Sequence, residues 1–107
     1  MESFNKIEIR GIVGQASIST VAGRLLASFS VATSEIITKD VVETTWFQVV
    51  AAEAPGIEIE HLAKGVMVLV KGRVRMRCYE AADGSYRQFP EIEARELKVE
   101  PTNEEEA

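Results

Sequence analysis

Polar and apolar residues alternate along most of this chain, which is the pattern of half-buried β-strands. Near the start, for example, Ile7, Ile9 and Val13 alternate with polar side chains. An apolar run over residues 66–70 leads into a further alternating stretch. The pattern predicts five strands, over residues 6–13, 25–34, 45–51, 66–79 and about 86–99, with a polar connection at 14–23 and a loop at 35–44.

The segment between the third and fourth predicted strands is the only candidate for a helix. Pro55 and Gly56 open it, and Lys64 and Gly65 close it, where a cation and a glycine suit a helix C-terminus. The predicted helix is short, with about two turns. Five strands with one short helix between strands 3 and 4 match the order of elements in an OB-fold, so we predict an all-β, five-stranded OB-fold barrel. Other small barrels fit the same order of elements.

The last predicted hairpin can be given a register from its turn at residues 83–85. We place Ala82 opposite Tyr86, because a shift by one residue would mix apolar and charged side chains on each face. The expected pairs on the apolar, inward face are Cys78 with Pro90, Met76 with Ile92, and Val74 with Ala94. The expected pairs on the other face are Tyr79 with Phe89, Arg77 with Glu91, Arg75 with Glu93, and Arg73 with Arg95.

The length of 107 residues and the composition indicate one globular domain. No apolar run approaches the roughly 20 residues of a membrane span. The N-terminus has no long apolar segment typical of a secretory signal. The single cysteine, Cys78, excludes an internal disulfide and suits a reducing compartment, so we expect a cytoplasmic protein. One histidine and one cysteine are too few for a structural zinc site built from these ligands.

The net charge of −5 is unevenly distributed along the chain. Four acidic residues lie within the last eight positions, so we expect a domain of residues 1–99 followed by a short, disordered, acidic tail, residues 100–107. Setting these four aside leaves 13 of the 17 acidic residues against 12 bases. Residues 64–77 hold five bases and no acid. Local charge of this kind matters more than net charge for attracting a polyanion.

Signals for catalysis are weak in this sequence. His61 has no acid–base partner in a recognisable motif, and Cys78 is expected to face inward. The chain has no glycine-rich phosphate loop, nucleophile elbow or metal-binding motif. A hydrolase or nuclease needs a carboxylate cluster, and only Glu91 and Glu93 are spaced as a pair on the basic face. We therefore expect a protein that is not an enzyme and that uses neither a cofactor nor a metal.

The fourth predicted strand carries a row of basic residues. Lys71, Arg73, Arg75 and Arg77 occupy every second position, so they share one face and lie roughly 6–7 Å apart. This distance is close to the phosphate spacing of an extended single strand. The alternative interpretation is a solvated face that is neutralised by the carboxylates of the fifth strand, in surface pairs that contribute roughly 0–1 kcal/mol each.

Aromatic residues accompany these cations. Tyr79 and Phe89 lie at the end of the basic row, and aromatics beside cations suit the stacking of nucleobases. Trp46 has the outward parity of the third predicted strand, because Phe47 and Val49 take the inward positions. The alternative for an outward tryptophan is a subunit interface or a place beneath a loop.

Several sequence segments, taken in their order along the chain, together resemble a known protein family. They are Asn5-Lys6-Ile7 with Gly11, Gly14-Gln15, residues 27–35, residues 45–50, residues 62–65, and then Val68, Val70, Gly72, Arg75, Arg77, Tyr79, Asp83 and Gly84. Together they resemble the OB-fold core of the bacterial single-stranded DNA-binding protein family over about residues 4–99. The resemblance implies a homotetramer built from dimers whose first strands pair, with a dimer as the alternative. An exposed edge on the first strand would favour the same pairing.

The resemblance also implies roles for individual residues. By position, Trp46 and Tyr79 match two stacking aromatics of the family, and Lys6, Lys64, Arg75 and Arg77 match basic positions near its DNA path. Ile36 and Ile37 stand where the family often has an aromatic residue, and Ala52 stands at another such position. The chain lacks the long linker and terminal phenylalanine of the family's tail, so tail-mediated recruitment of other proteins is not expected.

Our leading hypothesis is a non-catalytic single-stranded DNA-binding protein that acts in DNA replication, recombination or repair. It would hold extended DNA by stacking and by phosphate contacts, largely without reading sequence. The expected DNA-binding residues are Trp46, Tyr79, Phe89, Lys6, Lys64, Lys71, Arg73, Arg75 and Arg77. The alternative is a primosome-type OB-fold accessory or assembly module that acts mainly through protein–protein contacts.

Overall fold

Five strands and their connections make up the computed structural model, which describes residues 2–100. In chain order the strands are β1 (Ile7–Val21), β2 (Arg24–Thr38), β3 (Val41–Ala52), β4 (Met67–Glu80) and β5 (Tyr86–Glu100). They form a closed barrel in the order β1-β2-β3-β5-β4. The prediction of an all-β, five-stranded barrel is confirmed, and the barrel is consistent with an OB-fold.

The barrel closes because β1 pairs with two neighbours in succession. Residues Ile7 to Ile12 pair with β4, and the stretch from Ile12 to Val21 pairs with β2, both antiparallel. The ladder to β2 is irregular between Val13 and Ala16, where β1 changes partner. The remaining seam is a short parallel contact between residues 49–50 of β3 and 92–93 of β5.

The core fills the barrel with aliphatic side chains around one large aromatic ring. Phe29 of β2 and Leu97 of β5 are among its largest fully buried side chains. The buried hydrophobic residues are Val13, Ala27, Phe29, Val31, Val49, Ala51, Ile57, Ile59, Leu62, Val68, Val70, Ile92 and Leu97.

Two glycines allow strand backbones to cross in close contact. A Cβ at Gly11 of β1 would collide with the carbonyl oxygen of Ala32 in β2. A Cβ at Gly72 of β4 would collide with the carbonyl oxygen of Glu93 in β5. Gly72 lies at a bulge of the β4–β5 ladder, where Arg95 is the extra residue of β5. Any larger residue at either crossing would push the strands apart.

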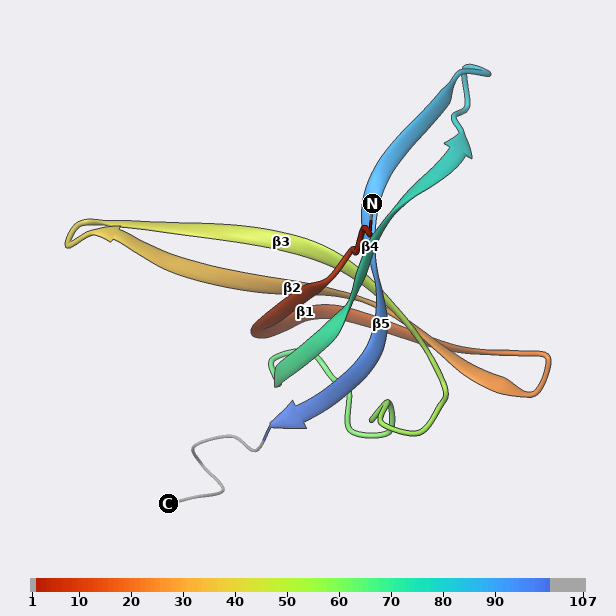
Figure 1. Cartoon of the computed structure of the whole chain (residues 1–107), viewed down its shortest axis with the longest axis horizontal. Coiled ribbons are helices and arrows are strands. Elements are labelled where there is room, and N and C mark those ends of the chain that lie inside the picture. Colours follow the sequence, from red (N-terminus) through yellow and green to blue (C-terminus); the bar gives the residue numbers. More distant parts are fainter. Residues whose placement is uncertain (1, 101–107) are drawn as a thin grey trace.

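Three hairpins extend out of the barrel in different directions (Figure 1). The predicted polar connection at 14–23 and the predicted loop at 35–44 are therefore wrong: both stretches continue as paired strands. Only two residues form each turn, Ala22–Gly23 and Lys39–Asp40. Outside the barrel both faces of a strand are exposed to water, so polar residues are tolerated at every position and the alternation disappears.

The predicted helix between β3 and β4 is also wrong, because residues 53–66 form turns instead. The backbone of this segment pairs with β5: the Glu58 N–H donates to the Leu97 carbonyl, and the Leu97 N–H donates to the Gly56 carbonyl, each at 2.9 Å. Gly56 has a φ of 84°, which is incompatible with a right-handed helix. The side chains from this segment that join the core are Ile57, Ile59 and Leu62.

The outer β4–β5 hairpin is shifted by two residues from its predicted register. Tyr86 lies opposite Glu80 rather than Ala82, because residues 81–85 form a longer connection than the predicted turn. A shift by an even number keeps each residue on its predicted face. The observed pairs are Cys78 with Gln88, Arg77 with Phe89, Met76 with Pro90, Arg75 with Glu91, Val74 with Ile92, Arg73 with Glu93, and Gly72 with Ala94.

Cys78 is exposed, which contradicts its predicted inward position. The hairpin has left the barrel at this point, so the inward parity of Cys78 leads to solvent. Glu100, the first residue of the predicted tail, is the last residue of β5, and its carboxylate lies 2.7 Å from Nη2 of Arg10. The rest of the predicted tail, residues 101–107, lies outside the described residues.

The crossing at Gly72 predicts a large effect of a small substitution. We expect Gly72→Ala to lower the free energy of unfolding by about 3 kcal/mol or more, because the added Cβ meets backbone that cannot move without opening the barrel. Gly84→Ala is the control: its φ is 87° and nothing lies near its Cβ, so we expect only about 1–2 kcal/mol of backbone strain. Urea unfolding at one protein concentration compares the two, and equal losses would contradict the role of the crossing.

Candidate nucleic-acid interface

Trp46 projects from the outer face of β3, which confirms the direction predicted from its parity. It is 61% exposed. Its indole lies against Gly14 of β1, where an added Cβ would come within 2.5 Å of the ring carbon Cζ3. The missing side chain of Gly14 therefore provides a flat backbone surface for the ring. The indole is supported from below while most of it stays open to solvent.

A polar groove of about 530 Å³ lies next to this support, between β1, β2, β3 and the connection before β4. Gln48 donates from Nε2 to the Ser28 hydroxyl at 2.8 Å, and the Gln15 N–H donates to the Ser30 hydroxyl at 3.1 Å. Lys64 also lines this groove and is the one cation among the lining residues that the structure describes. Hydroxyl and amide groups can bond to the edge of a nucleobase as donors or acceptors.

The hydroxyl and amide residues of this groove are absent from the predicted site, although the sequence contains a signal for them. Ser28 and Ser30 lie at the outward positions of β2, and Gln48 takes the same parity as Trp46 in β3. Their alternation with buried residues places them on the tryptophan face. A search limited to cations and aromatic residues overlooks them.

The Trp46 face continues outward along the β2–β3 hairpin. Farther along this face Ile36 lies opposite Val42, and both side chains are exposed. Glu35 and Glu43 lie opposite one another in the next register position, on the other face of the hairpin. The hairpin therefore has an uncharged face that is continuous with Trp46 and an acidic face behind it.

The second aromatic site lies on the outer β4–β5 hairpin. The ring centroids of Tyr79 and Phe89 are 5.6 Å apart, and the ring planes meet at 67° in an edge-to-face contact. The predicted aromatic pair therefore forms, although the two residues lie diagonally across the ladder. Tyr79 is exposed, so part of its ring is open to a ligand.

The basic row on β4 is paired with carboxylates along its whole length. Lys71 lies 3.8 Å from Glu8 of β1, and three arginines contact two glutamates of β5. The arginine contacts are Arg73 Nε with Glu93 Oε1 at 3.0 Å, Arg75 Nη1 with Glu93 Oε2 at 2.9 Å, and Arg77 Nη1 with Glu91 Oε2 at 3.3 Å. The neutralising contacts of the alternative interpretation are therefore present.

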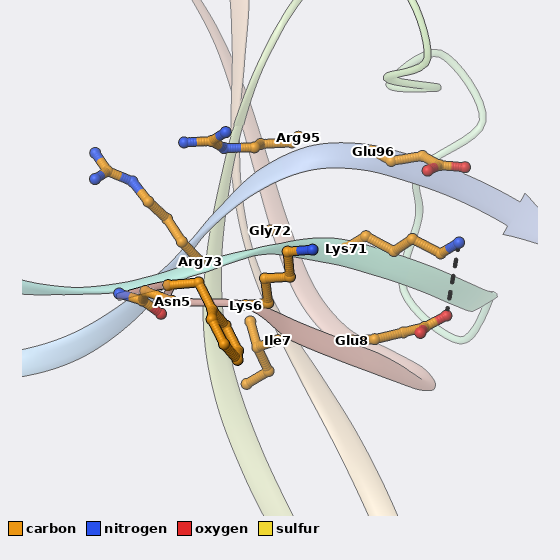
Figure 2. Close-up of a pocket in the computed structure, with 10 residues that line it drawn as sticks. Asn5, Lys6, Ile7, Glu8, Lys71, Gly72, Arg73, Arg95 and Glu96 are labelled. Carbon is orange, nitrogen blue, oxygen red and sulfur yellow. Dashed lines mark ion pairs between the residues drawn. The ribbon is translucent and has the colours of Figure 1, made fainter. Parts of the chain in front are cut away.

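Lys6 lines a hollow of about 770 Å³ at the junction of β1, β4 and β5 (Figure 2). Figure 2 shows the guanidinium groups of Arg73 and Arg95 toward one end of this hollow and the Glu8–Lys71 ion pair toward the other. Arg95 is absent from the predicted site, although its predicted place opposite Arg73 put it on the basic face. In the structure it is the extra residue of the bulge in β5, and it lines this hollow.

The nine predicted binding residues fall on three surfaces rather than in one cleft. The groove between β1, β2 and β3 holds Lys64 beside Trp46. The outer β4–β5 hairpin carries four more, and the junction of β1, β4 and β5 carries the other three. The hairpin residues are Arg75, Arg77, Tyr79 and Phe89, and the junction residues are Lys6, Lys71 and Arg73.

The residues weighed for catalysis do not come together in the described part of the chain. His61 lies exposed in the connection before β4, and Cys78 lies exposed on the outer hairpin. Within residues 2–100 no three histidine, cysteine, aspartate or glutamate side chains gather in a group able to hold a metal ion. The same residues contain no helix with the length and apolarity that crossing a membrane requires.

Comparisons with known proteins agree on one kind of protein. The family model described as the single-strand binding protein family matches residues 4–100 of this chain. The chain is also similar to a solved structure described as a Plasmodium falciparum SSB complex with ssDNA, with 26% sequence identity and a TM-score of 0.75. That similarity covers 92% of this chain and 95% of the other. A search of curated proteins finds no match.

The ion pairs of Glu93 predict a difference in stability at acid pH. Hydrogen bonds from Arg73 and then Arg75 hold the pKa of Glu93 below its ordinary value. A carboxylate with a lower pKa in the folded state stabilises the fold above its unfolded pKa of about 4.3, and the contribution is lost as the pH falls through the folded value. Between pH 7 and pH 3 we therefore expect the wild type to lose more stability than Glu93→Gln, as measured by thermal unfolding. Parallel pH profiles would contradict this linkage.

Proposed function

This chain belongs to the single-strand binding protein family, and we propose that it binds single-stranded DNA without catalysing a reaction. The observation that carries the proposal is the exposed indole of Trp46, which rests on Gly14 beside a polar groove. Every nucleobase offers a flat face for stacking, so such a platform holds DNA largely independently of sequence. The similar P. falciparum SSB, whose structure is a complex with ssDNA, supports the same function.

The proposed path brings an extended strand across the faces of Trp46 and Tyr79, with phosphates near the neighbouring cations. Lys64 lies in the groove beside Trp46, and this position supports a contact with a phosphate of a stacked nucleotide. The residues proposed to contact DNA are Trp46, Tyr79, Phe89, Lys6, Lys64, Lys71, Arg73, Arg75 and Arg77. Affinity should fall with rising salt, because phosphate contacts release counterions from the DNA.

Aliphatic side chains stand at two positions where the family often has an aromatic residue. Ile36 lies on the Trp46 face of the β2–β3 hairpin and is 78% exposed, and Ala52 ends β3 at an exposed position. A stacked base contributes about 1–3 kcal/mol, so the loss of stacking at two positions would weaken DNA binding by several kcal/mol relative to a family member that has both aromatic residues.

We propose a role in DNA replication, recombination or repair in the cytoplasm.

A protein-interaction module is the second candidate function, and one observation favours it. The tip of the β2–β3 hairpin exposes four β-branched side chains, Ile36, Ile37, Val41 and Val42. Exposed apolar side chains grouped in this way are typical of surfaces that contact another protein. In that case Trp46 would stabilise a complex between proteins, and single-stranded DNA would have no effect on its fluorescence.

Trp46 is the only tryptophan, so its fluorescence reports directly on the proposed site. We expect poly(dT) to quench this fluorescence strongly at low salt and less at moderate salt, whereas duplex DNA leaves it unchanged. We also expect Trp46→Ala to weaken binding of a labelled oligonucleotide by about tenfold or more, the loss of a stacked base. Val21→Ala, at the tip of the β1–β2 hairpin, removes an exposed apolar side chain away from the groove and should leave affinity unchanged. Absence of both quenching and oligonucleotide binding at low salt would refute DNA binding.

Self-association is the further part of this proposal. From Ile7 to Arg10, β1 pairs only with β4 among the described residues, which leaves its other edge open to a second chain. We expect sedimentation to give a mass of two or four chains at micromolar concentration. A single-chain mass over the whole concentration range would contradict pairing through this edge.

A further inference from the structure

In the free protein, each of the four cations of the basic row already forms an ion pair with a carboxylate. The row comprises Lys71, Arg73, Arg75 and Arg77, and each lies within 4 Å of a glutamate oxygen. By contrast Lys6, Lys64 and Arg95 have no ion pair with any residue of the described chain 2–100. A phosphate can reach these three cations without displacing a carboxylate, whereas at the basic row it must compete with the paired glutamates.

Glu93 differs from the other carboxylates because it holds two arginines at once. Its Oε1 accepts from Nε of Arg73 at 3.0 Å, and its Oε2 accepts from Nη1 of Arg75 at 2.9 Å. Its backbone is held on both sides, opposite Val50 of β3 at the parallel seam and opposite Arg73 in the ladder to β4. The carboxylate is therefore fixed under the basic row by the closure of the barrel.

Exposure distinguishes Glu93 from its neighbour on the strand. The side chain of Glu91 is 6% exposed, so a ligand cannot take its place on Arg77 without entering the protein. The side chain of Glu93 is 34% exposed, and those of Arg73 and Arg75 are 43% and 51% exposed. A ligand that approaches the row from solvent reaches these two arginines at the contacts with Glu93.

Carboxylate and phosphate oxygens bind a guanidinium in the same way, through charge-assisted hydrogen bonds to its N–H groups. We propose that Glu93 competes with DNA phosphates for Arg73 and Arg75, and thereby lowers both the affinity for single-stranded DNA and its dependence on salt. This inference rests on the proposed function. Glu93 would then not contact DNA itself but would determine how strongly the basic row binds the DNA phosphates.

The test compares Glu93→Gln with the wild type by titration of a labelled oligo(dT) at several salt concentrations. Glutamine keeps the size of the side chain and removes the charge. We expect binding to tighten by up to about fivefold at low salt, which is the upper end of the contribution of one exposed ion pair. The slope of log K against log salt should steepen by about 0.7 for each arginine that gains a phosphate.

Glu80→Gln is the matched control for charge. Glu80 lies exposed on the same hairpin, has no ion pair in the described chain, and gives the same change in net charge. We expect a smaller gain in affinity and no change of slope, because no arginine is released. An equal gain in both variants would show a general effect of charge and would overturn the competition.

Two further variants link the effect to the contact itself. Arg75→Ala should weaken binding more in the Glu93→Gln background than in the wild type, because only the released arginine contacts phosphate fully. Glu93→Asp keeps the charge but shortens the side chain, so it should give an intermediate gain in affinity. Equal effects of Arg75→Ala in both backgrounds would contradict the proposal.

The outcomes separate this inference from the proposed function. If wild type and variants alike fail to bind the oligonucleotide, DNA binding itself is refuted. If the wild type binds but Glu93→Gln binds equally or more weakly, the competition is refuted while DNA binding stands. Weaker binding by a variant with unchanged thermal unfolding would show that Glu93 instead holds the two arginines in place for DNA.

Discussion

The structure depends on closing a barrel from only five strands, which forces strand backbones into close contact at two crossings. Gly11 and Gly72 lie at these crossings, where any side chain would collide with a backbone carbonyl. Because β1 passes from β4 to β2 near the first crossing, one strand completes two sides of the barrel. The parallel seam between β3 and β5 needs only two residues of each strand.

This closure explains where the candidate interface lies. The strands are longer than the barrel requires, and they leave it as three hairpins that point in different directions (Figure 1). The core needs only the inner parts of the strands, so the outer parts are free to carry aromatic, charged and β-branched side chains. Trp46 lies where barrel and hairpin meet, and its ring rests on the bare backbone of Gly14. Rigid support and exposure are thus combined at one residue.

The same barrel closure determines how the charges of the basic row on β4 are paired. Glu93 lies at the seam that closes the barrel, so its carboxylate is held beneath Arg73 and Arg75. A strongly basic strand is thereby turned into a nearly neutral surface in the free protein. Under the proposed function, these contacts would lower the affinity for single-stranded DNA below what the number of cations suggests, and the aliphatic Ile36 and the small Ala52 would act in the same direction.

The barrel was predicted from the order of the elements and from the family resemblance. Alternation with a period of two predicted the five strands and the outward face of Trp46, because it records which side of a strand is buried. It did not determine the length of the hairpins, since strands exposed on both faces leave no such alternation. The helix expected from Pro55 to Gly65 does not form, because the backbone of this segment hydrogen-bonds to β5, which is distant from it in the sequence. The two-residue shift beside Cys78 escaped detection because both registers give each residue the same face. The sequence also paired Arg77 with Glu91 and Arg75 with Glu93, and both ion pairs form, although the two residues of each pair lie diagonally across the ladder. The contact of Glu93 with Arg73 could not be predicted, because the expected register placed Arg95 opposite Arg73 and nothing in the sequence marks the shifted register or the bulge.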